Sequence, residues 1–177
     1  MSKNFHLIKN GFTLIEILVV IAIIAFFSTF LIVGFRGNEK QRAINNAALS
    51  VVDGLKRMQT MAFSGSLVDS LTPVSYNFLI GNCSSNCSYI LRGQLVGSMF
   101  TEIEEVNFDK NILVDAGGSL EIKFASPRGA AMINENPLQE EATIKLSHKD
   151  SSLSPICVKV NRISGRMDIV KDPVNCP

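Results

Sequence analysis

Side chains that commonly carry catalysis are scarce in this sequence. Of its two histidines only His148 lies beyond the first eleven residues, which excludes a metal site built on several histidines. Neither a Gly-x-Ser-x-Gly nucleophile motif nor a glycine-rich phosphate-binding loop occurs. The carboxylate pairs Glu104-Glu105 and Glu140-Glu141 are adjacent in sequence, so in strands their side chains point to opposite faces and cannot share a substrate. The sequence therefore predicts a protein that is not an enzyme and holds neither cofactor nor metal.

An excess of charge of one sign is also absent. The chain has 17 lysines and arginines against 16 aspartates and glutamates, a formal net charge of +1. Without Lys3 and Lys9, near the N-terminus, the balance is 17 − 2 = 15 basic against 16 acidic residues, or −1. Nucleic acid binding depends on cations that neutralise phosphates, so a nearly neutral protein is a poor general ligand for it. Nucleic acid is therefore kept only as an alternative partner.

Charge is scarcest between Phe12 and Phe35, where Glu16 is the only ionisable side chain. A helix of roughly 24 residues is about 36 Å long, which exceeds the ~30 Å hydrocarbon core of a bilayer. We therefore predict a transmembrane helix over residues 12–35. A carboxylate in such a helix costs on the order of 2.5–3.5 kcal/mol, so Glu16 is expected to have a specific partner. The alternative is that its side chain reaches the membrane interface near the helix start.

The residues before this run are polar, lack any acidic side chain and end in Gly11. An ordinary secretory signal has a small-residue cleavage site after its apolar stretch, and no Ala-x-Ala pattern follows here. The order Lys-Asn-Gly-Phe-Thr-Leu-Ile-Glu from Lys9 to Glu16, with the apolar run behind it, instead resembles the class III signal of type IV prepilins and type II secretion pseudopilins. The resemblance implies that residues 1–11 are a leader, which the prepilin peptidase removes between Gly11 and Phe12. It also implies methylation of the new amine of Phe12.

The resemblance and the charge pattern agree on a role for Glu16. Cleavage would leave a cationic amine on Phe12, and Glu16 of a neighbouring subunit in the same apolar bundle would be its counter-charge. This pair can form only between molecules in register. Glu16 is therefore expected to favour assembly with other pilin or pseudopilin subunits through the N-terminal helix.

Four cysteines follow the predicted span: Cys83, Cys87, Cys157 and Cys176. The lysines of the leader should hold the N-terminus in the cytoplasm, which places these cysteines in the periplasm, where disulfides persist. Three pairings are possible, and we favour Cys83–Cys87 with Cys157–Cys176 because the members of each pair are close in sequence and flanked by turn-forming residues. A four-thiolate zinc site is the alternative, although its usual Cys-x-x-Cys spacing is absent.

Residues 36–63 are predicted to continue the helix as an amphipathic segment. Apolar residues recur there at steps of three and four and would form one stripe that packs on a sheet: Ile44, Ala48, Val51, Leu55, Met58 and Ala62. No proline occurs between Met1 and Ser70. We therefore expect a short flexible or bent joint at Gly34 and Gly37, after which the helix resumes.

Residues 64–177 are predicted to form one β-rich globular domain. A series of β-rich segments is bounded there by Gly, Pro, Asn or Ser: 74–80, 89–92, 102–108, 112–115, 120–124, 142–146, 156–160 and 166–170. One long helix followed by short strands indicates an α+β fold in which the helix packs on antiparallel sheet, as in pilins. We expect His148 at a strand end and the polar segment 127–141 as a mobile surface loop.

The chain is predicted to end in a hairpin with its turn at residues 161–165. With the upstream Phe-Ala-Ser-Pro-Arg-Gly of residues 124–129, this hairpin is similar to the minor pseudopilin group that includes the GspH and FimT proteins. Some competence-linked members of that group bind DNA through a Gly-Arg-x-Arg motif, which makes Arg162 and Arg166 the candidate DNA contacts. Asp168 stands where the second arginine would be. It shares a strand face with Arg166, so its carboxylate would partly cancel the guanidinium.

These features predict a minor pilin or pseudopilin, that is, a structural subunit of a type IV pilus or a type II secretion pseudopilus. It would be anchored in the bacterial inner membrane by one span, with its globular domain in the periplasm, and would join a filament after cleavage. The alternative is a minor pilin that captures DNA in natural transformation.

Overall fold

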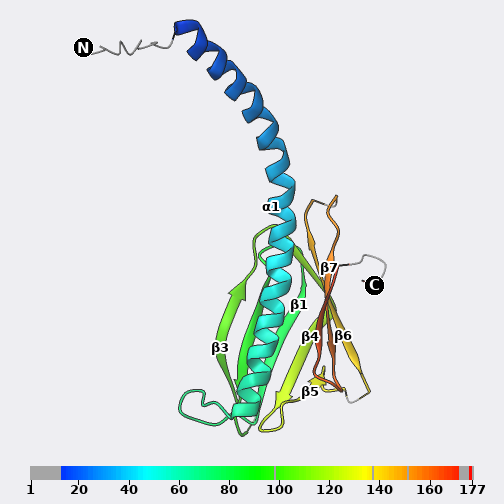
Figure 1. Ribbon diagram of the computed structural model, residues 1–177. Helices are drawn as coiled ribbons and strands as arrows, with labels where there is room; N and C mark the ends of the chain where they lie inside the picture. The colour runs from blue at the N-terminus through cyan, green and yellow to red at the C-terminus, as the bar shows by residue number, and fades with distance from the viewer. Residues whose placement is uncertain (1–12, 98, 137, 151, 172–175, 177) are drawn as a thin grey trace, which may run out of the picture. The chain divides into compact units, whose positions relative to one another are not determined.

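The computed structural model describes residues 13–97, 99–136, 138–150, 152–171 and 176, and the side chains of all these except residues 29–38. The chain divides into two compact units, Met1–Glu39 and Lys40–Pro177. One helix, α1 (Leu14–Ser64), belongs to both units, and the strands that follow it all lie in the second (Figure 1). These strands are β1 (Ser75–Cys83), β2 (Ser88–Gln94), β3 (Phe100–Asn107), β4 (Ile112–Ala125), β5 (Ala130–Ile133), β6 (Glu141–His148), β7 (Ile156–Asn161) and β8 (Met167–Val170).

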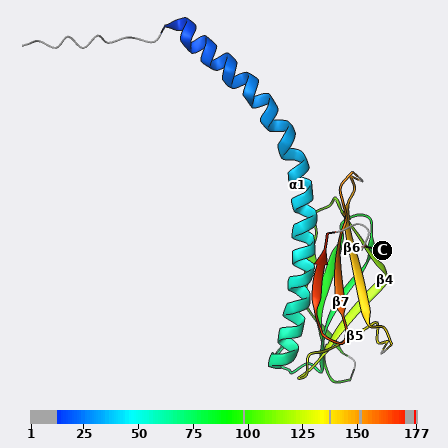
Figure 2. The same cartoon turned by 45° about the vertical axis from the view of Figure 1, so that its right-hand side comes forward.

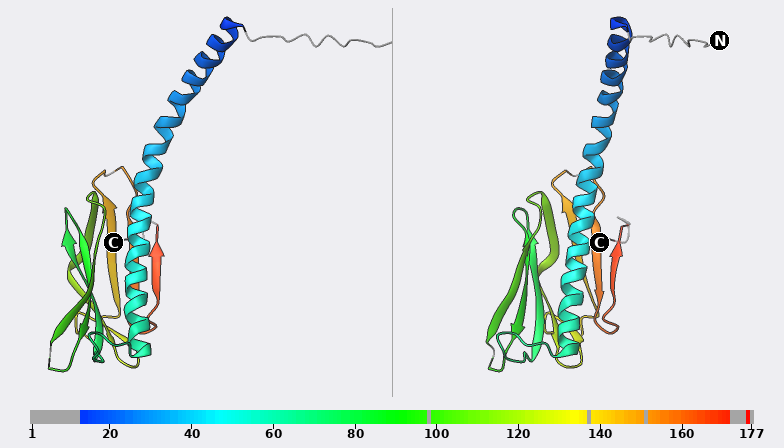
Figure 3. Two further views of the ribbon diagram at one scale, coloured as in Figure 1. Left: turned by 90° about the vertical axis from the view of Figure 1, so that its left-hand side faces the viewer. Right: turned by 60° about the vertical axis from the view of Figure 1, so that its left-hand side comes forward.

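The strands form one antiparallel sheet in the order β3-β2-β1-β4-β6-β7-β8, and β5 pairs with the last residues of β4 (Figure 2). In most strands alternate residues face the core, as Tyr76, Phe78 and Ile80 do in β1. The part of α1 in this unit lies along one face of the sheet (Figure 3). The predicted α+β architecture of a long helix on antiparallel sheet is therefore confirmed.

The predicted apolar stripe of α1 is the helix side of this core. Ile44, Ala48, Val51, Leu55, Met58 and Ala62 are all fully buried. The helix ends as the sequence suggests: Gly65 has a φ of 61°, and the N–H of Ser66 donates to the carbonyl of Met61 at 3.2 Å. This is the Schellman arrangement, in which a glycine in the left-handed region ends a helix. By contrast, α1 runs through Gly34 and Gly37 without interruption, so the helix does not stop and resume there as predicted.

Two predicted strands are in fact one. Strand β4 joins the segments 112–115 and 120–124, although Gly117 and Gly118 between them have φ values of 71° and 122°. The side-chain oxygen Oδ1 of Asn82 accepts hydrogen bonds from the backbone N–H groups of Ala116 and Gly118, at 2.6 and 3.0 Å. A side chain from β1 therefore stabilises an irregular stretch that the two glycines alone suggested to be a turn.

The segment 127–141, predicted as a loop, also contains a strand. β5 pairs with β4 from Ile122↔Ile133 to Ala125↔Ala130. Ala131 and Ile133 are buried, so this strand contributes to the core. The prediction was wrong because four residues between polar neighbours are too short a run to show a clear period in the sequence.

All four cysteines form disulfides, in the pairs Cys83–Cys87 and Cys157–Cys176. This is the pairing favoured from the sequence, and it leaves no thiolate for the alternative zinc site. Cys157 and Cys176 are buried, and their bond ties the end of the chain to β7.

Because neighbouring strands are antiparallel, each connection between strands lies at one of the two ends of the second unit. The β2–β3, β4–β5 and β7–β8 turns lie at the end where α1 finishes, which we call the distal end. The β6–β7 connection lies at the other end, close to Lys40. There the Nζ atom of Lys40 is 2.6 Å from Oδ2 of Asp150. His148 ends β6, as predicted, and its Nδ1 accepts a hydrogen bond from the backbone N–H of Asp150 at 2.9 Å.

Gly54 lies where α1 closely approaches the sheet. A Cβ atom at this position would lie 2.8 Å from Cε2 of Tyr89 on β2. The Tyr89 ring is buried, stacks on Phe78 with 4.9 Å between ring centroids, and donates its hydroxyl hydrogen to the Ser50 carbonyl at 3.0 Å. Because the ring is held on several sides, it cannot move away from an added methyl group.

We expect Gly54→Ala to destabilise the second unit, although alanine favours a helix over glycine by up to ~1 kcal/mol. Overpacking against Tyr89 should cost about 1–3 kcal/mol and outweigh that gain. Urea unfolding of a fragment that begins at Lys40 measures the change. Asp53→Ala, at the exposed neighbouring position, is the matched control and should not destabilise. A Gly54→Ala fragment as stable as the parent would contradict the packing argument.

The Lys40–Asp150 pair predicts a dependence of stability on pH. The hydrogen bond from Lys40, together with those from Ser152, holds the pKa of the Asp150 carboxyl well below its usual range. A depressed folded-state pKa gives a stabilisation that is present above the unfolded pKa of about 3.9 and is lost as the pH falls below it. Asp150→Asn should therefore be less stable than the parent at neutral pH. The difference should shrink on acidification, and chemical unfolding at several pH values would show it.

Candidate functional site

The first turn of α1 contains the predicted assembly residue Glu16. Thr13 precedes the helix, and its backbone carbonyl accepts hydrogen bonds from the N–H groups of Glu16 and Ile17, at 3.1 and 3.3 Å. The Thr13 hydroxyl also accepts from the Glu16 N–H, at 3.4 Å. Thr13 is thus the N-cap and Glu16 the third helical residue, which is the Thr-x-x-Glu order of a capping box. A carboxylate in this turn is also favoured by the helix dipole.

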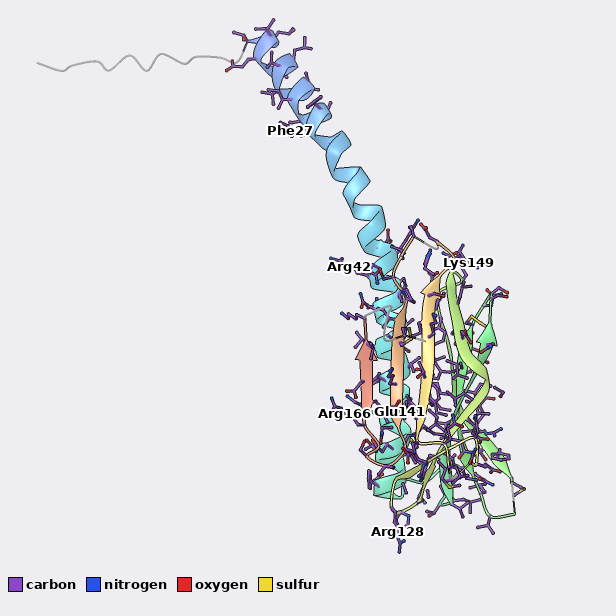
Figure 4. All side chains as sticks on the ribbon, turned by 90° about the vertical axis from the view of Figure 1, so that its right-hand side faces the viewer. Phe27, Arg42, Arg128, Glu141, Lys149 and Arg166 are labelled. Carbon is purple, nitrogen blue, oxygen red and sulfur yellow. A yellow bond between two sulfur atoms is a disulfide. The ribbon has the colours of Figure 1, made fainter. Side chains whose placement is uncertain are left out.

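The following turns are apolar on every side. Leu14 is 79% exposed, Ile15 70% and Phe27 63%, although these three side chains face different directions around the helix. The labelled Phe27 in Figure 4 belongs to this stretch of bare side chains. A helix that is hydrophobic all round is ordinarily buried in a membrane or among other helices. Within the described residues, this chain supplies no such cover.

Over the part of the chain that the structure describes, no helix has an apolar stretch long enough to cross a bilayer. The predicted cleavage position between Gly11 and Phe12 lies outside the described residues.

The Glu16 side chain is exposed, and among the described residues no cation lies within ion-pair distance of it. Its predicted partner, the amine of a neighbouring Phe12, would come from another molecule. The structure thus adds a capping role for Thr13, which the Thr-x-x-Glu spacing could have indicated from the sequence.

The two candidate DNA contacts lie in and beside the β7–β8 turn. Nε of Arg166 is 2.8 Å from Oδ1 of Asp168, so this guanidinium is already paired with the carboxylate expected to oppose it. Nε of Arg162 donates to the Gln139 carbonyl at 3.1 Å, which ties this side chain to the β5–β6 connection. The alternative of DNA capture is therefore not favoured.

The adjacent carboxylates do not form a catalytic pair. Glu104 is paired with Arg57, whereas Glu105 accepts a hydrogen bond from the Ser88 hydroxyl at 2.7 Å. Among the described residues, no three His, Cys, Asp or Glu side chains are grouped so as to hold a metal ion.

A groove at the distal end was not foreseen from the sequence. Its volume is about 490 Å³, and its lining includes Phe63 of α1, Arg128 of the β4–β5 turn, and Arg162 and Ile163 of the β7–β8 turn. Gly129 and Gly165 allow the two turns to lie against α1. A Cβ atom at Gly129 would lie 2.6 Å from the Phe63 ring, and one at Gly165 would lie 2.5 Å from Nε2 of Gln59. In the sequence, the glycines themselves were the available signal, because their φ values of 61° and 64° are ones that other residues rarely adopt.

The N-terminal segment is similar to a known protein family. Residues 8–32 match the family described as the prokaryotic N-terminal methylation motif. This match includes Gly11, Phe12 and Glu16. No curated protein matches the sequence. Among solved structures, the type IV minor pilin FimU of Pseudomonas aeruginosa is similar, with a TM-score of 0.49 and 11% sequence identity, over 79% of this chain and 93% of that one.

The methylation motif thus covers the residues that the leader hypothesis requires and the first turns of α1. The rest of α1 packs on an antiparallel sheet, as the resemblance implied. The chain therefore carries the prokaryotic N-terminal methylation motif, at the residues where the sequence resembles type IV prepilins and pseudopilins.

Proposed function

We propose that the chain is a minor pilin or pseudopilin, a structural subunit that is cut after Gly11 and joins a filament through its N-terminal helix. The observation that carries this proposal is the methylation motif at residues 8–32. It coincides with a helix whose side chains from Leu14 to Phe27 are exposed and, except for Glu16, apolar. Thr13 and Ser28 are the polar residues on either side of this stretch. Pilins are structural proteins, which supports a role without catalysis.

The same segment supports an anchor in the inner membrane before assembly. Burying one leucine, isoleucine or phenylalanine side chain is worth about 1.5–3 kcal/mol, and the exposed helix carries many of them. A lipid bilayer supplies that burial for a single precursor, and neighbouring helices supply it in a filament. The globular unit would then lie in the periplasm, where its two disulfides are stable.

Cleavage is tested by the mass of the mature protein. In a host that has the prepilin peptidase, we expect a chain that begins at Phe12 with a methylated amine. Gly11→Glu should leave the precursor uncut, because the residue before the cleaved bond would no longer be glycine. Gly34→Ala, within the same helix, is the control and should be processed normally. A chain that still begins at Met1 in such a host would contradict the proposal.

The assembly role of Glu16 gives a second prediction. Glu16→Val makes the segment more apolar, so membrane insertion should persist, whereas the intermolecular pair with Phe12 is lost. We expect at least a tenfold fall in the amount recovered in sheared filaments, since breaking one partner of a buried charge pair costs about 3–5 kcal/mol. Glu39→Val is the matched control, an exposed acidic position later in α1. Equal recovery of Glu16→Val and the parent would refute the pairing role.

A further inference from the structure

Most of the exposed large apolar side chains of the second unit lie at the distal end. They include Val96, Met99 and Phe100 at the β2–β3 turn, and Phe63 and Ile163 beside the β7–β8 turn. Val96 is 78% exposed and Ile163 70%. At the opposite end, by contrast, the described connections carry polar and charged residues such as Lys149, which Figure 4 shows far from Arg128. An apolar surface concentrated at one end of a globular unit is typical of a contact with another protein.

One flank of this surface is basic. The groove that contains Phe63 and Ile163 is also lined by Arg128 and Arg162, and no carboxylate is among its described lining residues. Arg162 is fixed in place, because its backbone N–H donates to the Glu140 carbonyl at 2.7 Å and its Nε to the Gln139 carbonyl. Arg128 is exposed and has no ion-pair partner among the described residues.

The other flank is acidic. Val96 and Met99 lie in the β2–β3 turn, and Glu102, on β3 just after it, is also exposed. Glu104 is neutralised by Arg57 and Glu105 is hydrogen-bonded to Ser88, but Glu102 has no such partner in the described part of the chain. This flank therefore offers an apolar tip beside an unpaired carboxylate, which complements an apolar groove beside the unpaired guanidinium of Arg128.

The positions of the two flanks favour a side-by-side contact. β3 is one edge strand of the sheet, whereas the groove adjoins the turn that leads to β8, the other edge strand. Both flanks lie at the same end of the unit. Two copies with parallel helices, placed next to each other, would therefore bring the β2–β3 turn of one to the groove of the next. Parallel helices are what a common membrane anchor imposes, so this step rests on the proposed function.

We propose that the β2–β3 turn of one copy, with Val96, Met99 and Glu102, docks in the Phe63–Arg128–Ile163 groove of a second copy. The contact is heterologous, because the two surfaces differ, so it can repeat from one copy to the next instead of closing on itself. Copies of this chain would accordingly lie next to each other in the assembly.

The test is photo-cross-linking of the full-length protein in cells. A benzophenone side chain at Ile163 should give a dimer of two copies, and peptide mapping should place the cross-link near residues 95–102. Arg128→Glu or Glu102→Arg alone should lower the dimer yield about fivefold, the factor expected for an exposed ion pair turned into a repulsion. Both changes in one chain should restore at least half of the yield, because the opposite charges face each other again.

Two controls make the result decisive. Lys149→Glu reverses a charge at the other end and should leave the yield unchanged, and a benzophenone at the exposed Leu49 of α1 should give little dimer. A cross-link at Ile163 no stronger than at Leu49, or a double variant that stays low, would overturn the proposed contact. The mass of the same samples separates the two hypotheses. A chain that begins at Phe12 without the cross-link refutes only the contact, whereas a chain that begins at Met1 refutes the pilin role.

Discussion

The contact between the apolar stripe of α1 and one face of the sheet determines where the rest of the second unit lies. The stripe is buried along its whole length from Ile44 to Ala62. Gly54 allows the Tyr89 ring to approach the helix backbone, which fixes β2 against it. At its end α1 presents Gln59 and Phe63 to the glycines of two turns. The helix therefore positions not only the core but also the turns that carry the distal groove.

The parts of α1 in the two units need different surroundings. From Lys40 on, one side of α1 is covered by the chain's own sheet, and the other sides are polar enough to face water. From Leu14 to Phe27 the apolar side chains point in all directions, and the described residues offer them no cover. Such a segment is stable only where lipid or other helices surround it. Its single carboxylate, Glu16, lies in the first turn, where the helix dipole favours a negative charge.

Features with a regular period were the ones that the sequence predicted well. The stripe from Ile44 to Ala62 follows the helical period, and most strands alternate between buried and exposed residues, so both were found. The strand β5 was not, because Ala130–Ile133 is too short to show a period. The continuity of β4 depends on Asn82, which is far away in sequence and stabilises the glycine stretch. The distal groove is formed by three segments that are far apart in sequence, so no local sequence pattern could predict it.

The edges of the sheet restrict how the second units of two copies of the chain can contact each other. β3 carries three glutamates and a register shift against β2 between Leu91 and Arg92, which leaves Ile103 without a registered partner. Bulges and charges on an edge strand hinder the addition of another strand. β8 at the other edge has only four residues, among them Asp168. A neighbouring unit would therefore gain little by extending the sheet. The exposed apolar residues lie on the turns instead, so contacts between units are expected there, where side chains rather than backbone groups decide the fit.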